Sequence, residues 1–137
     1  MTSIQSASSK PVSGPFYVDA EAAESFGRRL LVVHGLPEKD AATVSRCLVL
    51  ADLRGVDTHG LQTLPHYLER VRRGLVNPRP NLKVERVTPM VGSLDGQNAF
   101  GFVVATKAMA EAIDTAREFG VGIVSARRSG LVAGRCC

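Results

Sequence analysis

Aromatic residues are scarce in this 137-residue sequence, which has no tryptophan and an aromatic content of only 5%. Proteins that bind nucleic acid usually combine a basic surface with aromatic side chains on which bases stack. The formal net charge is +4, but the arginines and lysines are interleaved with aspartates and glutamates and form no basic stripe. We therefore expect no nucleic acid partner.

Long apolar runs and a disulfide framework are also missing. No stretch reaches the roughly 18 consecutive apolar residues that a membrane-spanning helix requires, so we expect no membrane association. The three cysteines are Cys47 and the adjacent pair Cys136 and Cys137. This arrangement indicates a reducing compartment, because it offers no set of disulfide pairs.

Metal-ligand spacing and a signal peptide are absent as well. The histidines at positions 34, 59 and 66 show no spacing with the cysteines that suits zinc, so we expect no metal site. Residues 1–15 are rich in serine and proline and lack an apolar segment. They predict a disordered tail, and the cytoplasm is the expected location.

Three helices are predicted in the first half of the chain. Apolar residues recur at three- and four-residue spacing from Val18 to Val33, with Asp19 as a possible N-cap. The expected buried face of this helix consists of Ala22, Phe26, Leu30 and Val33. The second helix opens at Pro37 and is expected to bury Ala41, Val44, Leu48 and Ala51. The third has Thr63 as its N-cap and is expected to bury Leu64, Tyr67, Leu68 and Val71.

The second half of the chain predicts strands around one further helix. "LKVERV" alternates as a strand, and "MVGSLDGQN" predicts a strand that ends in an Asp-Gly turn. Residues 101–119 predict a helix, and "VGIVSA" (121–126) predicts a short buried strand. The helix is expected to face inward through Val104, Ala108, Ala112, Ile113 and Ala116. The order of elements indicates an α/β domain with a helical N-terminal layer, followed by mixed strands and a helix.

His59 stands in the sequence "DTHG", within a segment (55–62) that predicts a turn between two helices. A histidine there can exchange protons near neutral pH or hydrogen-bond a substrate carboxylate or carbonyl, and Thr58 can orient its ring. The alternative is a structural histidine beside a threonine that bonds its own backbone. Spacing alone favours this alternative, because turn histidines are common.

The segment "DGQNAFG" also has two interpretations. A glycine-containing loop that leads into a helix N-terminus is one form of phosphate site. The segment matches neither the dinucleotide fingerprint nor the P-loop, and a turn followed by Asn98 as a helix N-cap explains it as well.

Several motifs, taken together and in order, resemble the malate/L-lactate dehydrogenase family. They are "ADLRGVDTHGLQTLPHYLERVRRGLVNPRP", "LDGQNAFG" and "AMAEAIDTAREFGVGIVSAR". Typical members carry "RG-x-x-SHG", a tyrosine eight residues after the histidine, "G-x-x-NP-x-P" and "DG-x-N-x-x-G". The similarity runs from about Phe16 to Ala126, which predicts three parts: a tail (1–15), the N-terminal part of the family domain (16–126) and an atypical end (127–137).

The resemblance implies an NAD- or NADP-dependent oxidoreductase that transfers hydride between the cofactor and a 2-hydroxy or 2-oxo acid such as malate or lactate, in a homodimer. It implies that Thr58 and His59 are catalytic and face the substrate and the nicotinamide, with Thr58 where serine is usual. By the same resemblance, Tyr67 contacts the substrate, and Ser129 contacts the cofactor together with His59. It thus favours the functional interpretation of His59.

Two positions depart from the family pattern. Thr63 replaces an arginine that is available to a substrate carboxylate, which puts the substrate preference in question. Leu131 stands where the family carries the histidine usually assigned as proton acceptor, although Ser129 and the pair Ala133-Gly134 keep part of that loop. The unfamiliar end is what a shifted reading frame or an altered splice would produce, so we expect a truncated chain that is inactive alone. The alternative is a non-catalytic binding or interaction module derived from the family.

Overall fold

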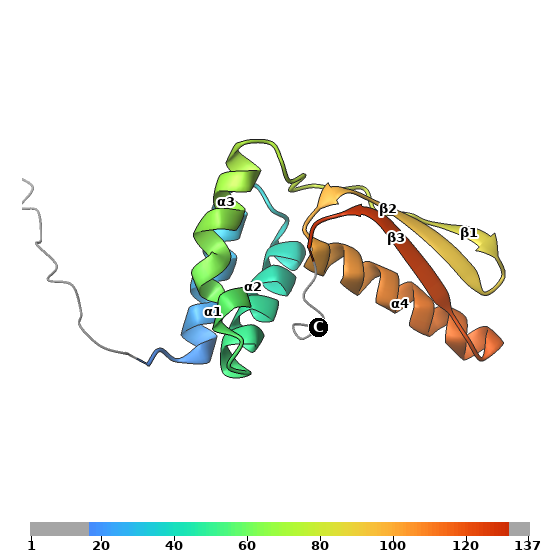
Figure 1. Ribbon diagram of the computed structural model, residues 1–137, viewed down its shortest axis with the longest axis horizontal. Coiled ribbons are helices and arrows are strands. Elements are labelled where there is room, and N and C mark those ends of the chain that lie inside the picture. The colour runs from blue at the N-terminus through green and yellow to red at the C-terminus, as the bar shows by residue number, and fades with distance from the viewer. Residues whose placement is uncertain (1–16, 132–137) are drawn as a thin grey trace, which may run out of the picture.

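The computed structural model describes residues 17–131, in which a layer of three helices adjoins a three-stranded sheet backed by a fourth helix (Figure 1). This is the predicted α/β class with its helical N-terminal layer. The predicted tail (1–15) and the pairs Ala133-Gly134 and Cys136-Cys137 lie outside the described residues. No helix among residues 17–131 is long and apolar enough to cross a membrane.

The first two helices, α1 (Ala20–Val33) and α2 (Glu38–Leu53), pack against each other as a pair. The Asp19 side chain accepts a hydrogen bond from the Ala22 N–H at 2.9 Å and caps α1, as predicted. The predicted face of α2 is confirmed, because all four of its residues are fully buried (Ala41, Val44, Leu48 and Ala51).

The predicted face of α1 is confirmed for Leu30, which packs against the core, and is wrong for Phe26 and Val33, which are 50% and 80% exposed. The buried residues of α1 are Gly27 and Leu31. Gly27 lies so close to α2 that a Cβ atom there would meet Ser45 Oγ at 2.5 Å. The helix therefore turns Gly27 and Leu31 inward, and Phe26 and Val33 lie on more exposed faces.

The third helix, α3 (Leu64–Arg72), begins after Thr63 and has Pro65 in its first turn, as predicted. Leu64 is buried, and three further apolar residues of the predicted face pack against the core (Tyr67, Leu68 and Val71). The segment between α2 and α3 consists of two short 3₁₀ turns, η1 (Asp57–His59) and η2 (Leu61–Thr63). His59 thus lies in the irregular segment that was predicted.

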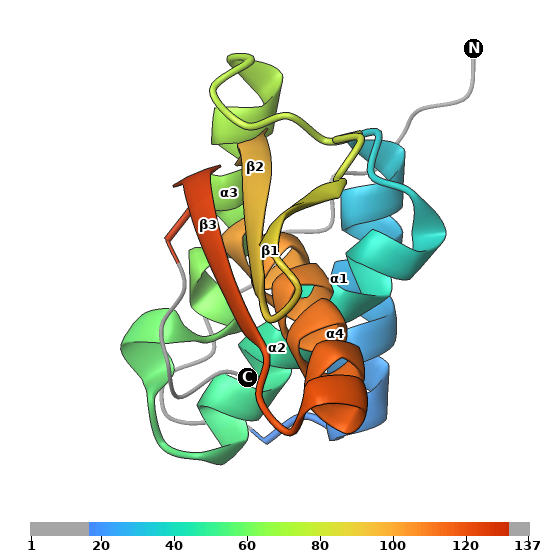
Figure 2. The same ribbon diagram turned by 90° about the vertical axis from the view of Figure 1, so that its right-hand side faces the viewer.

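The sheet has the order β1-β2-β3, with β1 (Val84–Thr88) antiparallel and β3 (Ile123–Ser129) parallel to β2 (Val91–Ala99). Helix α4 (Gly101–Phe119) connects β2 to β3 and covers one face of the sheet (Figure 2). Its bounds and its end at Gly120, which has a φ of 80°, agree with the sequence prediction. One predicted inward residue of α4 is wrong, since Ile113 is 45% exposed.

The predicted Asp-Gly turn is wrong, because Asp95 and Gly96 lie inside β2 and the β1–β2 connection is at Pro89 and Met90. The absence of a side chain at Gly96 lets β3 approach β2 closely, because a Cβ atom there would lie 2.9 Å from the Arg128 carbonyl oxygen. Gln97 has a φ of 50° and forms an irregularity in the strand. Its side-chain amide bonds both backbone groups of Asn81, at 3.0 and 3.1 Å, and so ties the proline-rich linker to the sheet.

The predicted N-cap of α4 is also wrong. Phe100 precedes the helix and Asn98 belongs to β2, where its carbonyl oxygen accepts a hydrogen bond from the Asn77 N–H at 3.0 Å. Phe100 is buried and joins the core of the helical layer, together with Phe102 of α4. The chain entering α4 therefore connects the two layers of the fold.

The strand predicted from "VGIVSA" forms, but it is not buried in the described part of the chain. Within β3, Ile123 is 55% exposed and Val124 alone is partly buried, against Leu94 and Val104 on the side of α4. Val87 of β1 is 66% exposed. Periodicity predicted a strand, but it could not tell that one face of the sheet has no covering element among residues 17–131 (Figure 2).

Candidate functional site

The "DTHG" segment forms a compact turn at the C-terminal end of α2, and it joins Thr58 to His59 directly. Thr58 Oγ1 and His59 Nδ1 are 2.9 Å apart and share one hydrogen bond, whose donor depends on the tautomer of the ring. The His59 N–H donates to the Val56 carbonyl oxygen at 2.9 Å. With Nδ1 held in this way, the second ring nitrogen, Nε2, is the one that can exchange a proton with another molecule.

Asp52 holds the turn from the last turn of α2, and the sequence analysis missed it. Its Oδ2 accepts a hydrogen bond from the Leu61 N–H at 2.8 Å. A Cβ atom on Gly60 would overlap the same carboxylate, so only glycine, which has no side chain, fits at this position of "DTHG". Its φ of −86° is open to any residue. A carboxylate near a helix C-terminus opposes the helix dipole, and that placement is the signal that could have identified Asp52.

Thr63, at the position where the resemblance implies an arginine, faces the turn. Its hydroxyl donates a hydrogen bond to the Gly60 carbonyl oxygen at 2.7 Å. Gln62 adds a second bond within the segment, from its side-chain amide to the Asp57 carbonyl oxygen. Both side chains stabilise the turn, and neither carries a charge for a substrate carboxylate.

Tyr67 lies further along α3 and packs at the junction of the two layers. Its ring centroid is 5.6 Å from that of Phe100 and 6.2 Å from that of Phe102. Such tilted and edge-to-face arrangements are favourable between aromatic rings. The structure therefore places Tyr67 against the start of α4, whereas Thr58 and His59 lie in η1.

Ser129 lies at the end of β3, where it pairs with Ala99 of β2. Its hydroxyl donates to the Gly130 carbonyl oxygen at 3.0 Å, and the Gly130 N–H donates to the Ala99 carbonyl oxygen at 3.0 Å. Leu131 follows and is exposed. The end of β3 is thus fixed beside the start of α4, on a different element from His59.

Charge at this end of the sheet is concentrated around Asp95, which pairs with Arg128 and, at 3.9 Å, with Arg127. Asp95 of β2 accepts a hydrogen bond from Arg128 Nε of β3 at 2.8 Å, and Arg128 has a φ of 49°. This contact, with a further bond from the Gln97 N–H, lowers the pKa of Asp95 to about 2. Asp95 therefore remains ionised at neutral pH and ties the two strands together.

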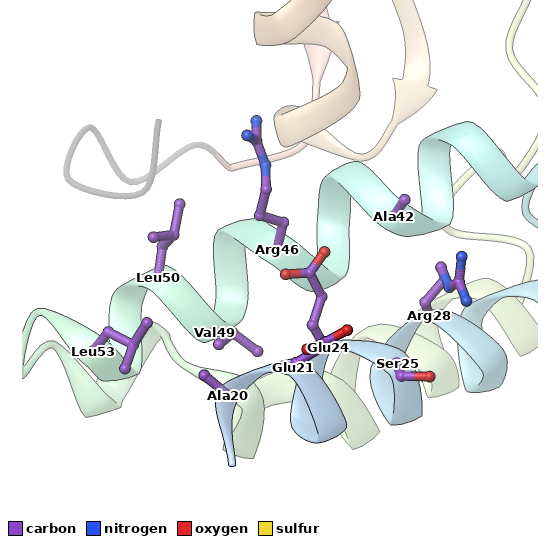
Figure 3. Close-up of a pocket in the computed structure, with 10 residues that line it drawn as sticks. All are labelled: Ala20, Glu21, Glu24, Ser25, Arg28, Ala42, Arg46, Val49, Leu50 and Leu53. Atoms are coloured by element: carbon purple, nitrogen blue, oxygen red, sulfur yellow. The ribbon is translucent and has the colours of Figure 1, made fainter.

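A groove between α1 and α2 lies apart from the candidate residues (Figure 3). It is lined in part by Arg46, Leu50 and Leu53, and Arg46 points away from α1. None of Thr58, His59, Tyr67 and Ser129 lines it. Within residues 17–131, no group of three histidine, cysteine, aspartate or glutamate side chains could hold a metal ion.

Comparison with known proteins identifies a family for the chain. The malate/L-lactate dehydrogenase family matches residues 18–134. A malate dehydrogenase of Pyrococcus abyssi is 45% identical over 105 residues, which are 77% of this chain and 29% of that enzyme. The ureidoglycolate dehydrogenase (NAD(+)) of Escherichia coli K12 is 40% identical over 96 residues, or 70% of this chain and 28% of that enzyme.

The fold agrees with the sequence comparison. The structure of malate dehydrogenase from Pyrococcus horikoshii OT3 superimposes with a TM-score of 0.79 and 40% identity, over 85% of this chain and 36% of that protein. The chain thus spans about a third of the length of the relatives that it matches. By the family match and by these similarities, the chain belongs to the malate/L-lactate dehydrogenase family.

Proposed function

We propose that this chain carries the His59 side of the active site of an NAD- or NADP-dependent dehydrogenase for 2-hydroxy or 2-oxo acids. The observation that carries the proposal is the hydrogen bond between Thr58 Oγ1 and His59 Nδ1, 2.9 Å long, in a turn held at the end of α2. Membership in a family whose relatives are named as dehydrogenases of malate and ureidoglycolate supports the substrate class. The cytoplasm remains the predicted location.

Proton handling at His59 defines the role of Thr58 in this proposal. If His59 Nε2 accepts a proton from a substrate hydroxyl, Nδ1 must already carry a hydrogen, which it donates to Thr58 Oγ1. The imidazolium that forms keeps this bond, because both of its nitrogens are donors. Thr58 thus acts as the acceptor that keeps the proton on Nδ1 in both states, and Tyr67 is proposed as a substrate contact on α3.

The cofactor would be a nicotinamide dinucleotide, and one relative is named as NAD(+)-dependent. The described residues fit it in part, because the end of β3 offers the hydroxyl of Ser129 and the compact backbone of Gly130 beside the start of α4. When bound, the dinucleotide supplies the hydride acceptor or donor. Ser129 and His59 would contribute cofactor contacts, and the remaining contacts would come from the two thirds of the family fold that this chain does not span.

Two residues limit what the chain does alone. Leu131 can neither donate nor accept a proton, and the hydroxyl of Thr63 bonds the Gly60 carbonyl oxygen and supplies no positive charge. A positioned proton-transfer group is typically worth about 10² to 10⁴ in rate. We therefore propose that the 137-residue chain is inactive alone, although it preserves the His59 turn of the family.

The test compares the isolated chain with a chimera in which residues 18–126 replace the matching segment of Pyrococcus horikoshii malate dehydrogenase, so that the position of Leu131 is supplied by that enzyme. NADH and NADPH absorbance is followed with a panel of 2-oxo acids. We expect oxidation of the nicotinamide by the chimera and none by the isolated chain. A folded chimera without turnover would contradict the proposed function, and turnover by the isolated chain would contradict its inactivity.

The expected homodimer is part of this proposal, and it is supported by the exposed apolar side chains of the sheet, such as Val87 and Ile123. Exposed apolar patches of this kind commonly mark surfaces that bind protein. Sedimentation of the isolated chain is expected to show a dimer, and a monomer at all concentrations would contradict it. A stable dimer together with an inactive chimera would favour the alternative, a non-catalytic interaction module.

A further inference from the structure

Asp52 is a carboxylate at a position in α2 that does not favour negative charge. It lies in the last turn of α2, next to the final residue Leu53, and negative charge is disfavoured at a helix C-terminus by the helix dipole. Its Oδ2 instead accepts the Leu61 N–H at 2.8 Å, nine residues away. A hydrogen bond to an ionised acceptor is stronger than one between neutral groups.

Contact with Asp52 involves both residues that follow His59 in the chain. The carboxylate lies directly against the Cα of Gly60, where any side chain would overlap it, and it bonds the N–H of Leu61. The other hydrogen bonds described for this segment join residues at most five positions apart, such as those from Gly60 to Asp57 and from Gln62 to Asp57. Local bonds from the N–H groups of Gly55 and Val56 tie the start of the segment to α2, and Asp52 ties its far side, at Gly60 and Leu61, to the same helix.

We propose that Asp52 is a positioning residue for His59: by fixing the backbone of Gly60 and Leu61 against α2, it sets the direction of the imidazole and preserves its bond to Thr58. The inference rests on the proposed function of His59. It adds a requirement that the "DTHG" sequence does not contain, namely a carboxylate in the last turn of the preceding helix. Because Asp52 accepts its hydrogen bond from a backbone N–H, that of Leu61, the positioning role requires a side chain of the same length with an acceptor oxygen.

The test uses nitrogen-15 NMR of the histidine rings in the full 137-residue chain at a pH where His59 is neutral. The ring nitrogen shifts report the ratio of the two tautomers, and donation from Nδ1 to Thr58 Oγ1, which the proposed function requires, favours the tautomer protonated at Nδ1. Asp52→Ala is expected to move this ratio for His59 roughly fivefold toward that of free histidine, the size expected for loss of one net hydrogen bond. Asp52→Asn keeps an acceptor oxygen in place and is expected to restore the ratio.

Asp114→Ala is the matched control, because Asp114 is an exposed helical carboxylate of α4 that pairs with Arg117 at 2.9 Å. It is expected to leave the His59 ratio unchanged. If Asp52→Ala does not fold, Gly60→Ala provides the same test, since its methyl group displaces the carboxylate without removing it.

An unchanged His59 ratio in a folded Asp52→Ala chain would overturn the proposal and leave Asp52 with a purely structural role. Failure of both Asp52→Ala and Gly60→Ala to fold would overturn it in the same way. The measurement needs no turnover, so its outcome is independent of the chimera assay. An inactive chimera with the expected tautomer change would refute the proposed function and retain the positioning role.

Discussion

Truncation of Phe100 tests whether the helical layer and the sheet form one cooperative unit. Phe100 is 3% exposed, and it contributes its ring to the core of the helical layer while its backbone leads from β2 into α4. Phe100→Ala removes this ring together with its contact to Tyr67, whose centroid is 5.6 Å away. The backbone of Phe100, with a φ of −56° and a ψ of 129°, accommodates alanine without strain.

The expected cost is about 3 to 5 kcal/mol of unfolding free energy, the usual range for phenylalanine truncation in a core. This includes roughly 0.5 to 1.5 kcal/mol for the aromatic pair. A domain of this size has about 5 to 15 kcal/mol in total, so the loss is a large share of its stability. At roughly 3 to 5 °C per kcal/mol, Tm is expected to fall by about 9 to 25 °C.

Urea unfolding followed by circular dichroism measures this loss, with Phe119→Ala as the matched control. Phe119 is the last residue of α4 and is 43% exposed, so its truncation is expected to cost less than about 1.5 kcal/mol. If Phe100→Ala costs no more than Phe119→Ala, or if the two layers unfold in separate transitions, the proposed connection through Phe100 is wrong.

Two further predictions concern the sheet and α4. Arg128 lowers the pKa of Asp95 to about 2, below its ordinary 3.8, so the bond stabilises the fold above about pH 4 and its contribution is lost as the pH falls toward 2. When Tm is measured from pH 2 to 6, we expect its fall toward low pH to be less steep in Asp95→Asn than in the unaltered chain. Parallel Tm profiles for the two proteins would contradict this. Gly122, between α4 and β3, approaches α4 so closely that the Cβ of an alanine would overlap the Ala112 carbonyl oxygen, so Gly122→Ala is expected to destabilise the chain by about 1 to 3 kcal/mol or more. An unchanged midpoint of urea unfolding would refute this close approach.

Helix positions were predictable from sequence because they depend on short-range signals. Asp19, Pro65 and Gly120 mark the cap, the first turn and the end of helices through local backbone geometry. Which face of α1 is buried was not predictable in this way. It depends on the close approach of Gly27 to Ser45 of another helix, a contact that periodicity within α1 cannot reveal.

The Asp-Gly pair shows a similar limit for strands. Asp95 and Gly96 predicted a turn because this pair commonly forms one, yet the close approach of β3 and the Arg128 pair keep both residues in β2. At the candidate site, sequence identified Thr58 and His59, whose direct contact the structure provides. Asp52 escaped notice because its partners are backbone groups that folding brings back against α2.

The central claim is that His59 handles the substrate proton, and one comparison tests it most directly. In the chimera described above, kcat for 2-oxo acid reduction is measured for His59→Ala and for His34→Ala, whose ring lies at the end of α1 and bonds the Leu30 carbonyl oxygen at 2.8 Å. We expect His59→Ala to lower kcat by about 10² to 10⁴ and His34→Ala to leave it within a few fold. Equal rates for the two variants would contradict the assignment of His59.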